Sequence, residues 1–138
     1  MLLRRRGRIG YGKALGPELV PDPTFTSTDT WWEAAGWVVS GGVGTATAAA
    51  SASLLQLEPV NRPSVVIGQR FEYRFVIDSI TQGAFAYTGV GGTGPTVTTP
   101  GVYSGQVIAT ATGTGQVAIR TTGTTSGVVS SFSFKRVY

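Results

Sequence analysis

Side chains that commonly carry chemistry are few in this sequence. It contains 7 Asp and Glu, 11 Lys and Arg, 3 Trp and 5 Tyr, but no His and no Cys. Without His and Cys, a Ser-His-Asp triad, a cysteine nucleophile and a zinc site of the usual ligands are excluded. Carboxylates remain as the main candidates for catalysis, and aromatic and basic side chains as candidates for binding.

The carboxylates do not show the pairing that a glycosidase needs. Such enzymes hold two acids roughly 5–10 Å apart in a cleft. Glu72 and Asp78 share one face of a predicted strand, where the rise per residue separates them by about 20 Å. Asp22, Asp29 and Glu33 gather in one loop, where turn capping and solvation account for them. We therefore expect no enzyme activity, no metal site and no cofactor.

Positive charge is concentrated at the N-terminus. Residues 1–13 carry five basic side chains and no acid, and residues 14–138 carry the other 6 basic and all 7 acidic groups, a balance of 6 − 7 = −1. This basic arm either anchors the protein to an acidic partner surface or is a solvated tail. Direct nucleic-acid binding is not expected, because the rest of the chain adds no basic patch. The candidate anchoring residues are Arg4, Arg5, Arg6, Arg8, Tyr11 and Lys13.

Three aromatic residues are candidates for contact with a sugar or a protein. Trp31 and Trp32 are adjacent, so in an extended chain they point to opposite faces and one of them should be exposed. Tyr87 has the same ambiguity. Exposed aromatic rings stack on sugars or anchor protein contacts, although packing in the core is the commoner use. Trp37, followed by two valines, is expected in the core.

These residues must be positioned by strands. Gly accounts for 20 residues and β-branched residues are abundant, a composition typical of short strands joined by turns. In Gln69–Ile80 the residues Phe71, Tyr73, Phe75 and Ile77 alternate with polar ones, which predicts one buried face. Further strands are expected in segments 37–40, 44–53, 53–57, 84–88, 97–99, 102–111, 116–122 and 128–137, although an Ala-rich helix competes for 44–53.

The expected organisation is an N-terminal arm and one domain. Residues 1–17 are predicted to be a flexible basic arm, because their glycines leave no face to bury. Residues 18–138 are predicted to form an antiparallel β-sandwich of about eight strands. No signal peptide or membrane span is recognised, so synthesis in a cytoplasm is expected.

The order of motifs resembles that of carbohydrate-binding-module-like jelly rolls. Glu18-Leu19-Val20 and Phe25 precede Trp-x-x-x-x-Gly-Trp, which ends at Trp37, and then Gly-Gly-Val-Gly-Thr-Ala. The segments 97–103 and 132–137 are similar to this family's Thr-x-x-Gly-x-Tyr strand and closing strand. The resemblance covers about residues 15–138 and implies a jelly-roll sandwich. Pro21-Asp22-Pro23-Thr24 replaces the family's Asn-Gly-Asp, and the acids near its closing strand are missing, so structural calcium is not expected.

A basic arm followed by Leu-Gly-Pro-Glu-Leu-Val also looks like the start of structural proteins of tailed bacteriophages. This resemblance implies a structural or decoration protein of a phage-like virion, on the head or the tail, assembled in the bacterial host cytoplasm. Its expected partners are other capsid or tail proteins, and symmetric copies of the chain itself. The alternative interpretation is a carbohydrate-binding module that attaches to cell-surface glycan.

Overall fold

The computed structural model describes residues 14–138, and strands make up most of this part. Its one helical element is the short turn η2 (Pro59–Asn61), and no helix within residues 14–138 could span a membrane. The strands are β1 (Leu15–Glu18), β2 (Trp31–Glu33), β3 (Trp37–Ser40), β4 (Val43–Ala49), β5 (Leu54–Leu57), β6 (Ser64–Val65), β7 (Arg70–Gly89), β8 (Gly92–Thr93), β9 (Gly101–Ile108), β10 (Gly113–Thr114) and β11 (Val117–Val137).

Two long strands, β7 and β11, organise the fold. They run antiparallel and pair from Arg70 with Val137 to Gly89 with Val117. On the other side of β7 lie β9 and β8, and on the other side of β11 lie β5, β4 and β1. A straight strand of this length would extend roughly 65 Å, so the β7–β11 ribbon has to fold back to form a core.

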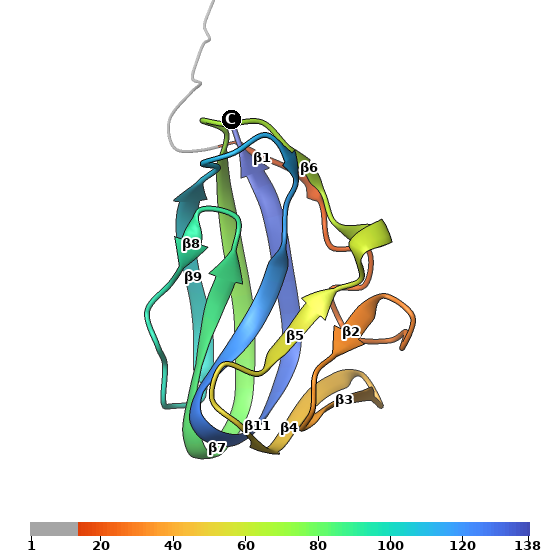
Figure 1. Ribbon diagram of the computed structural model, residues 1–138, viewed down its shortest axis with the longest axis vertical. Coiled ribbons are helices and arrows are strands. Elements are labelled where there is room, and N and C mark those ends of the chain that lie inside the picture. Colours follow the sequence, from red (N-terminus) through yellow and green to blue (C-terminus); the bar gives the residue numbers. More distant parts are fainter. Residues whose placement is uncertain (1–13) are drawn as a thin grey trace, which may run out of the picture.

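Both long strands turn back at the same level, at the bottom of Figure 1. Gly83 in β7 has φ +76° and Gly123 in β11 has φ +69°, the left-handed region that favours glycine. The Thr125 hydroxyl fastens this bend to Ala84, because its oxygen accepts the Ala84 N–H (3.3 Å) and it donates to the Ala84 carbonyl (3.2 Å). Each long strand therefore contributes one half to each layer of a sandwich.

The two layers can be named by their edge strands. The β2 layer contains β2, β5, residues 117–122 of β11, residues 84–89 of β7, and β8. The β9 layer contains β3, β4, β1, residues 127–137 of β11, residues 70–80 of β7, and β9. In Figure 1 the β2 layer is drawn in front of the β9 layer. The edges β9 and β8 are on one side of the sandwich, and β3 and β2 are on the other.

Aromatic rings fill the space between the layers. Tyr73 of the β9 layer stacks on Tyr87 of the β2 layer with ring centroids 4.3 Å apart and planes at 5°. Phe134 stacks on both Tyr87 and Phe71, at 6.0 and 5.0 Å. Such offset stacks add to the free energy gained by burying the rings. The core therefore follows from the inward positions of alternating strands.

The predicted fold class is confirmed: the chain is an all-β antiparallel sandwich of the jelly-roll type. The face of Phe71, Tyr73, Phe75 and Ile77 is buried as predicted. The small-residue segment forms strand β4, and not a helix.

Several boundaries differ from the prediction. The strand expected in 97–99 is reduced to a single bridge between Val97 and Phe85, and the strand expected in 102–111 ends at Ile108. The two strands expected in 69–88 are one strand, β7, because the positive φ of Gly83 lets the ladder continue around the bend. The strands expected in 116–137 are likewise the single strand β11. Strand β1 begins at Leu15, which pairs with Val137, so Leu15 to Pro17 belong to the sheet and not to the arm.

Candidate functional site

The adjacent tryptophans point to opposite faces, as predicted. Trp31 is 2% exposed and packs against Phe25 and Phe132, with ring centroids 4.9 and 5.8 Å away. Its indole N–H donates to the Asp22 carbonyl at 3.2 Å. Trp32 is 52% exposed on the outer face of the β2 layer. Trp32 is therefore the member of the pair that a ligand can reach.

Tyr87 and Trp31 are excluded as contact residues for a sugar or a protein, because both side chains are buried. Tyr87 is fully buried and donates its hydroxyl hydrogen bond to the Val90 carbonyl at 2.8 Å. Burial, with the nearby Tyr73, raises the pKa of the Tyr87 hydroxyl. The sequence misplaces Tyr87 because a short alternating segment does not say which of its faces meets the second layer.

The predicted anchoring residues Arg4, Arg5, Arg6, Arg8, Tyr11 and Lys13 lie outside the described residues. The chain enters the described part at residue 14, next to β1. Their role stays a prediction.

A straight row of side chains crosses the outer face of the β2 layer. Cross-strand pairing joins Trp32 to Gln56, Gln56 to Ala118, Ala118 to Thr88, and Thr88 to Thr93. At about 4.8 Å per strand, the row is roughly 19 Å long. It begins with an aromatic ring, continues over a small side chain and ends in two hydroxyls.

The amide of Gln56 is held in place beside Trp32. Its oxygen accepts hydrogen bonds from Gln116 Nε2 at 2.5 Å and Arg62 Nη2 at 2.9 Å. Arg62 is itself held by the Leu57 carbonyl, 3.3 Å from its Nε. Within the described residues no group bonds the Gln56 amide nitrogen or the Gln116 amide oxygen. The Gln56 amide is therefore fixed on the same face as the exposed ring, and Gln116 is fixed on its far side.

Two small side chains and one further cation, Arg120, belong to this face. Ala118 and Ala86 point outward yet are 0% and 1% exposed, so their longer neighbours lie over them. Arg120 pairs with Ala86 and lies two residues from Ala118. Its Nε is buried without a hydrogen-bond partner in the described part of the chain. We call Trp32, Gln56, Gln116, Arg62 and Arg120 the tryptophan face.

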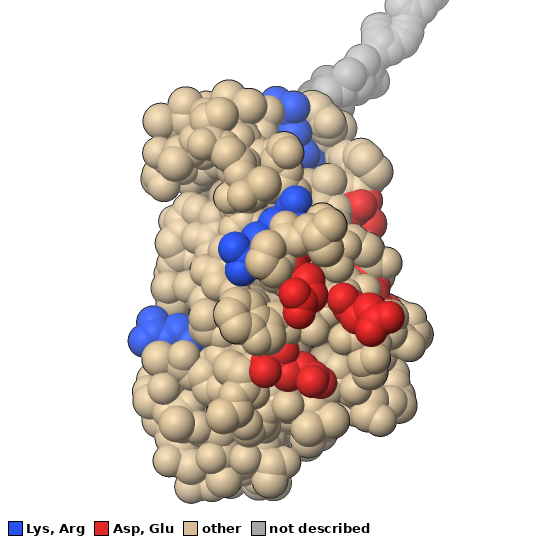
Figure 2. Space-filling model, turned by 45° about the vertical axis from the view of Figure 1, so that its right-hand side comes forward, with Lys and Arg blue, Asp and Glu red and all other residues tan. Residues whose placement is uncertain are grey.

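Figure 2 shows acidic groups gathered near the middle of the face in view, with basic groups above and beside them, on a surface that is otherwise uncharged. Glu33, next to Trp32, is turned away, because its carboxylate accepts the N–H of Val39 in β3. Glu18 accepts from the Ser133 hydroxyl (2.6 Å) and the Phe134 N–H (2.8 Å). Within residues 14–138 no three His, Cys, Asp or Glu side chains are grouped as metal ligands. The Glu33 and Glu18 carboxylates therefore act in structural hydrogen bonds.

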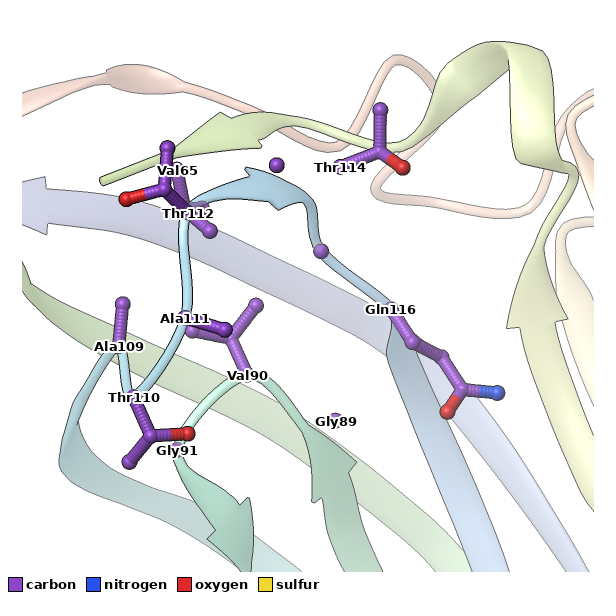
Figure 3. A pocket seen from close by; sticks show the side chains of 12 residues that line it. Val65, Gly89, Val90, Gly91, Ala109, Thr110, Ala111, Thr112, Thr114 and Gln116 are labelled. Atoms are coloured by element: carbon purple, nitrogen blue, oxygen red, sulfur yellow. The ribbon is translucent and has the colours of Figure 1, made fainter. Parts of the chain in front are cut away.

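A hollow at the end of the sandwich borders the tryptophan face, because Gln116 also lines the hollow. Its volume is about 180 Å³, and its wall contains no charged and no aromatic side chain. Figure 3 shows the hydroxyl oxygens of Thr110, Thr112 and Thr114 pointing in different directions. One of them, Thr112, already accepts the Ile67 N–H at 3.0 Å. Ligand sites are commonly ~300–1,000 Å³ with converging polar groups, so the tryptophan face is the stronger candidate.

Sequence reasoning misses Gln56, Gln116, Arg62 and Arg120. The segment Leu54–Leu57 does contain one signal, a glutamine between two leucines that are fully buried. Alternation alone places Gln56 on the face opposite those leucines. Its position beside Trp32 depends on the pairing of β2 with β5, which no local pattern reveals.

Comparisons with known proteins give a match in structure only. No family model matches the sequence, and no curated protein does. The apo structure of BiXyn10A CBM1 is similar with a TM-score of 0.52 and 14% identity, over 83% of this chain and 93% of that chain. The CBM22-1 xylan-binding domain of Xyn10C from Paenibacillus barcinonensis has a TM-score of 0.49 and 18% identity, over 91% of this chain and 97% of that chain. The first of these similarities shows a shared fold.

Proposed function

We propose that this protein is a non-catalytic carbohydrate-binding module whose tryptophan face binds a glycan. The observation that carries the proposal is Trp32, a half-exposed indole on a flat sheet face beside a fixed amide. The apolar face of a sugar ring stacks on such an indole, while its hydroxyls need donors and acceptors held nearby. The Gln56 nitrogen and the Gln116 oxygen meet that need.

Two further observations support this function. The fold is shared with a solved module whose name marks it as a carbohydrate-binding module, although the low identity carries no residue over. The row from Trp32 to Thr93 spans roughly 19 Å of the outer sheet face, a length that suits an extended chain of several sugar units better than a single sugar in a pocket. The absence of His and Cys fits a role without acid–base chemistry.

Affinity electrophoresis of the full chain in gels containing different soluble polysaccharides tests the proposal. The protein should be retarded by at least one of them. Trp32→Ala should weaken that binding by about tenfold or more, since one base or ring stacked on an aromatic side chain contributes on the order of 1–3 kcal/mol.

Tyr138→Ala is the matched control, because Tyr138 is 68% exposed but follows the C-terminal end of β11 and does not belong to the tryptophan face. It should bind as the unaltered chain does. Equal retardation of the Trp32 variant, or no retardation of the unaltered chain in any gel, would contradict the proposal.

A virion role is a second proposal, supported by the charge pattern. The five basic residues of 1–13 precede β1, which is fixed to β11 through Leu15 and Glu18. A basic arm that leaves from a fixed strand is suited to hold the module on an acidic surface of a particle, while the tryptophan face projects. In that case the glycan would be on the host cell.

Removing residues 1–13 tests the anchoring step while leaving β1 intact. The truncated chain should fold and bind glycan as before, but should lose incorporation into particles. Unchanged incorporation would contradict the virion role and leave the glycan-binding proposal untouched.

A further inference from the structure

One edge of the sandwich is long and unprotected. Strand β9 pairs with β7 along Gly101–Ile108, and in the described residues no strand pairs with its other side. Val102 is 57% exposed and Ile108 45% exposed on its outer face. The other outermost strands β2, β3 and β8 are two to four residues long, whereas β9 has eight.

The direction of the free backbone groups follows from the bonds at the end of β9. Ala109 N donates to the Gln69 carbonyl, and the Ala109 carbonyl accepts from Gly68 N, both at 2.8 Å. In an antiparallel ladder, residues alternate between facing the partner strand and facing away from it. The odd-numbered residues of β9 therefore bond to β7. The even-numbered residues, from Val102 to Ile108, turn their N–H and C=O groups to the open edge.

Natural sheet edges usually prevent pairing with another chain by a charged side chain, a proline or a bulge. The sequence of β9 is GVYSGQVI, which contains no charge and no proline. Its pairing with β7 is regular, with no bulge between Gly101 and Ile108.

We propose that β9 pairs antiparallel with β9 of a second copy of this chain, about a two-fold axis at Gly105. This register places Val102 opposite the partner's Ile108, and Ser104 opposite the partner's Gln106. Apolar then faces apolar, and the Ser104 hydroxyl comes within reach of the partner's Gln106 amide. All four of these residues are even-numbered, so their backbone groups already face the second chain.

The side chains set opposite each other also favour this register over its neighbours. Arg74 pairs with Ser104, and Glu72 pairs with Gln106, within one chain. Pairing about Gly105 therefore makes one row of Arg74, Ser104, the partner's Gln106 and the partner's Glu72, with opposite charges at its two ends. Centring the axis on Ser104 instead would set Val102 against the partner's Gln106. Centring it on Gln106 would set Ser104 against the partner's Ile108.

The size of the contact sets its strength. One eight-residue strand pair buries much less than the roughly 800 Å² per partner of a stable interface, so the dimer should form in the micromolar to millimolar range. Strands β2 and β9 lie on opposite sides of the sandwich, so both tryptophan faces stay open in the dimer. Two tryptophan faces on one rigid dimer would bind a polysaccharide by avidity.

Sedimentation velocity of the full chain across that concentration range tests the dimer. The unaltered chain should shift from monomer to dimer. Val102→Lys should weaken the association by about tenfold or more, because the new charge would be buried opposite the partner's Ile108, whose neighbour in β7 is the partner's Arg70. Val38→Lys is the matched control, since Val38 is also 57% exposed but lies on the opposite edge strand β3. It should associate as the unaltered chain does.

The register has its own test, since the chain contains no cysteine. Under mild oxidation, a mixture of Ser104→Cys and Gln106→Cys chains should form a covalent dimer, and neither variant alone should. Paired Cα atoms in a ladder are about 4.5–5.5 Å apart, which a disulfide can bridge. A chain that stays monomeric throughout, a Val102 variant that associates as the Val38 control does, or equal cross-linking of one variant alone would each overturn the proposal.

Discussion

Asp22 is a single side chain that holds a whole turn in place. Its Oδ1 accepts from the Thr26 N–H (2.8 Å) and hydroxyl (2.7 Å), and its Oδ2 accepts from the Ser27 N–H (2.9 Å). This turn carries Phe25, which is 1% exposed and has φ +56°, into the core. Burial by itself raises the pKa of Asp22, but the hydrogen bonds from Thr26 and Ser27 outweigh burial and lower it.

A lowered pKa makes the contribution of Asp22 depend on pH. The stabilisation is complete above the pKa of the unfolded chain, about 3.9, and is lost as the pH falls through the lower pKa of the folded state. Asp22→Asn should therefore reduce the free energy of unfolding by about 1–3 kcal/mol at neutral pH, and by less under acid conditions. Urea unfolding at several pH values measures this.

Asp29→Asn is the matched control, because Asp29 is exposed in the same loop. It should leave the stability within about 0.5 kcal/mol of the unaltered chain at each pH. A loss for Asp22→Asn that does not shrink in acid would contradict the role of the ionised carboxylate.

The two adjacent tryptophans show how much of the exposure of single side chains could be predicted from the sequence. Alternation of Trp31 and Trp32 is enough to predict that one is exposed. Which one it is depends on Phe25 in the preceding loop and on Phe132, about a hundred residues further along the chain, which both pack against Trp31. The partners of Trp32 on the tryptophan face come from β5 and β11, so residue spacing alone could not bring them together.

The bend of the long strands is the element that creates two layers from one sheet. A Cβ on Gly83 would lie 2.3 Å from Thr125 Oγ1 and 2.5 Å from the Thr124 carbonyl oxygen. Gly123, in the facing strand, has the same kind of φ but no atom within 4 Å of such a Cβ. The two glycines therefore separate the effect of crowding from the effect of backbone conformation.

Gly83→Ala should cost about 3 kcal/mol or more of unfolding free energy, and Gly123→Ala only about 1–2 kcal/mol, the usual cost of a left-handed non-glycine residue. Urea denaturation of both variants measures the difference. Equal losses would show that the close packing at Gly83 does not hold the bend.

Strand existence could be predicted here, and strand continuity could not. The alternation in 69–80 and in 84–88 predicts two strands, and both segments are strand. Gly83 looks like a turn between them because glycine is commonly a breaker. In the structure the same glycine lets a single strand fold back, and this outcome depends on β11 turning back beside it.

At the scale of the whole molecule, the two proposals use different sides of the sandwich. The β2 side presents the tryptophan face, and the opposite side presents the open β9 edge. The all-β class could be predicted from composition and turn residues, because β-branched residues suit a pleated sheet. The order of strands could not, since it joins segments more than a hundred residues apart, such as Glu18 with Ser133.

Oxidation of tryptophan by N-bromosuccinimide, located by mass spectrometry, tests the central claim most directly. Trp32 is the exposed indole, whereas Trp31 and Trp37 are 2% and 3% exposed, so the reagent should modify Trp32 first. A glycan that retards the protein in gels should slow this modification strongly at saturating concentration, and a glycan that does not should leave the rate unchanged. Oxidation of Trp32 at the same rate with saturating bound glycan as without it would contradict binding at the tryptophan face.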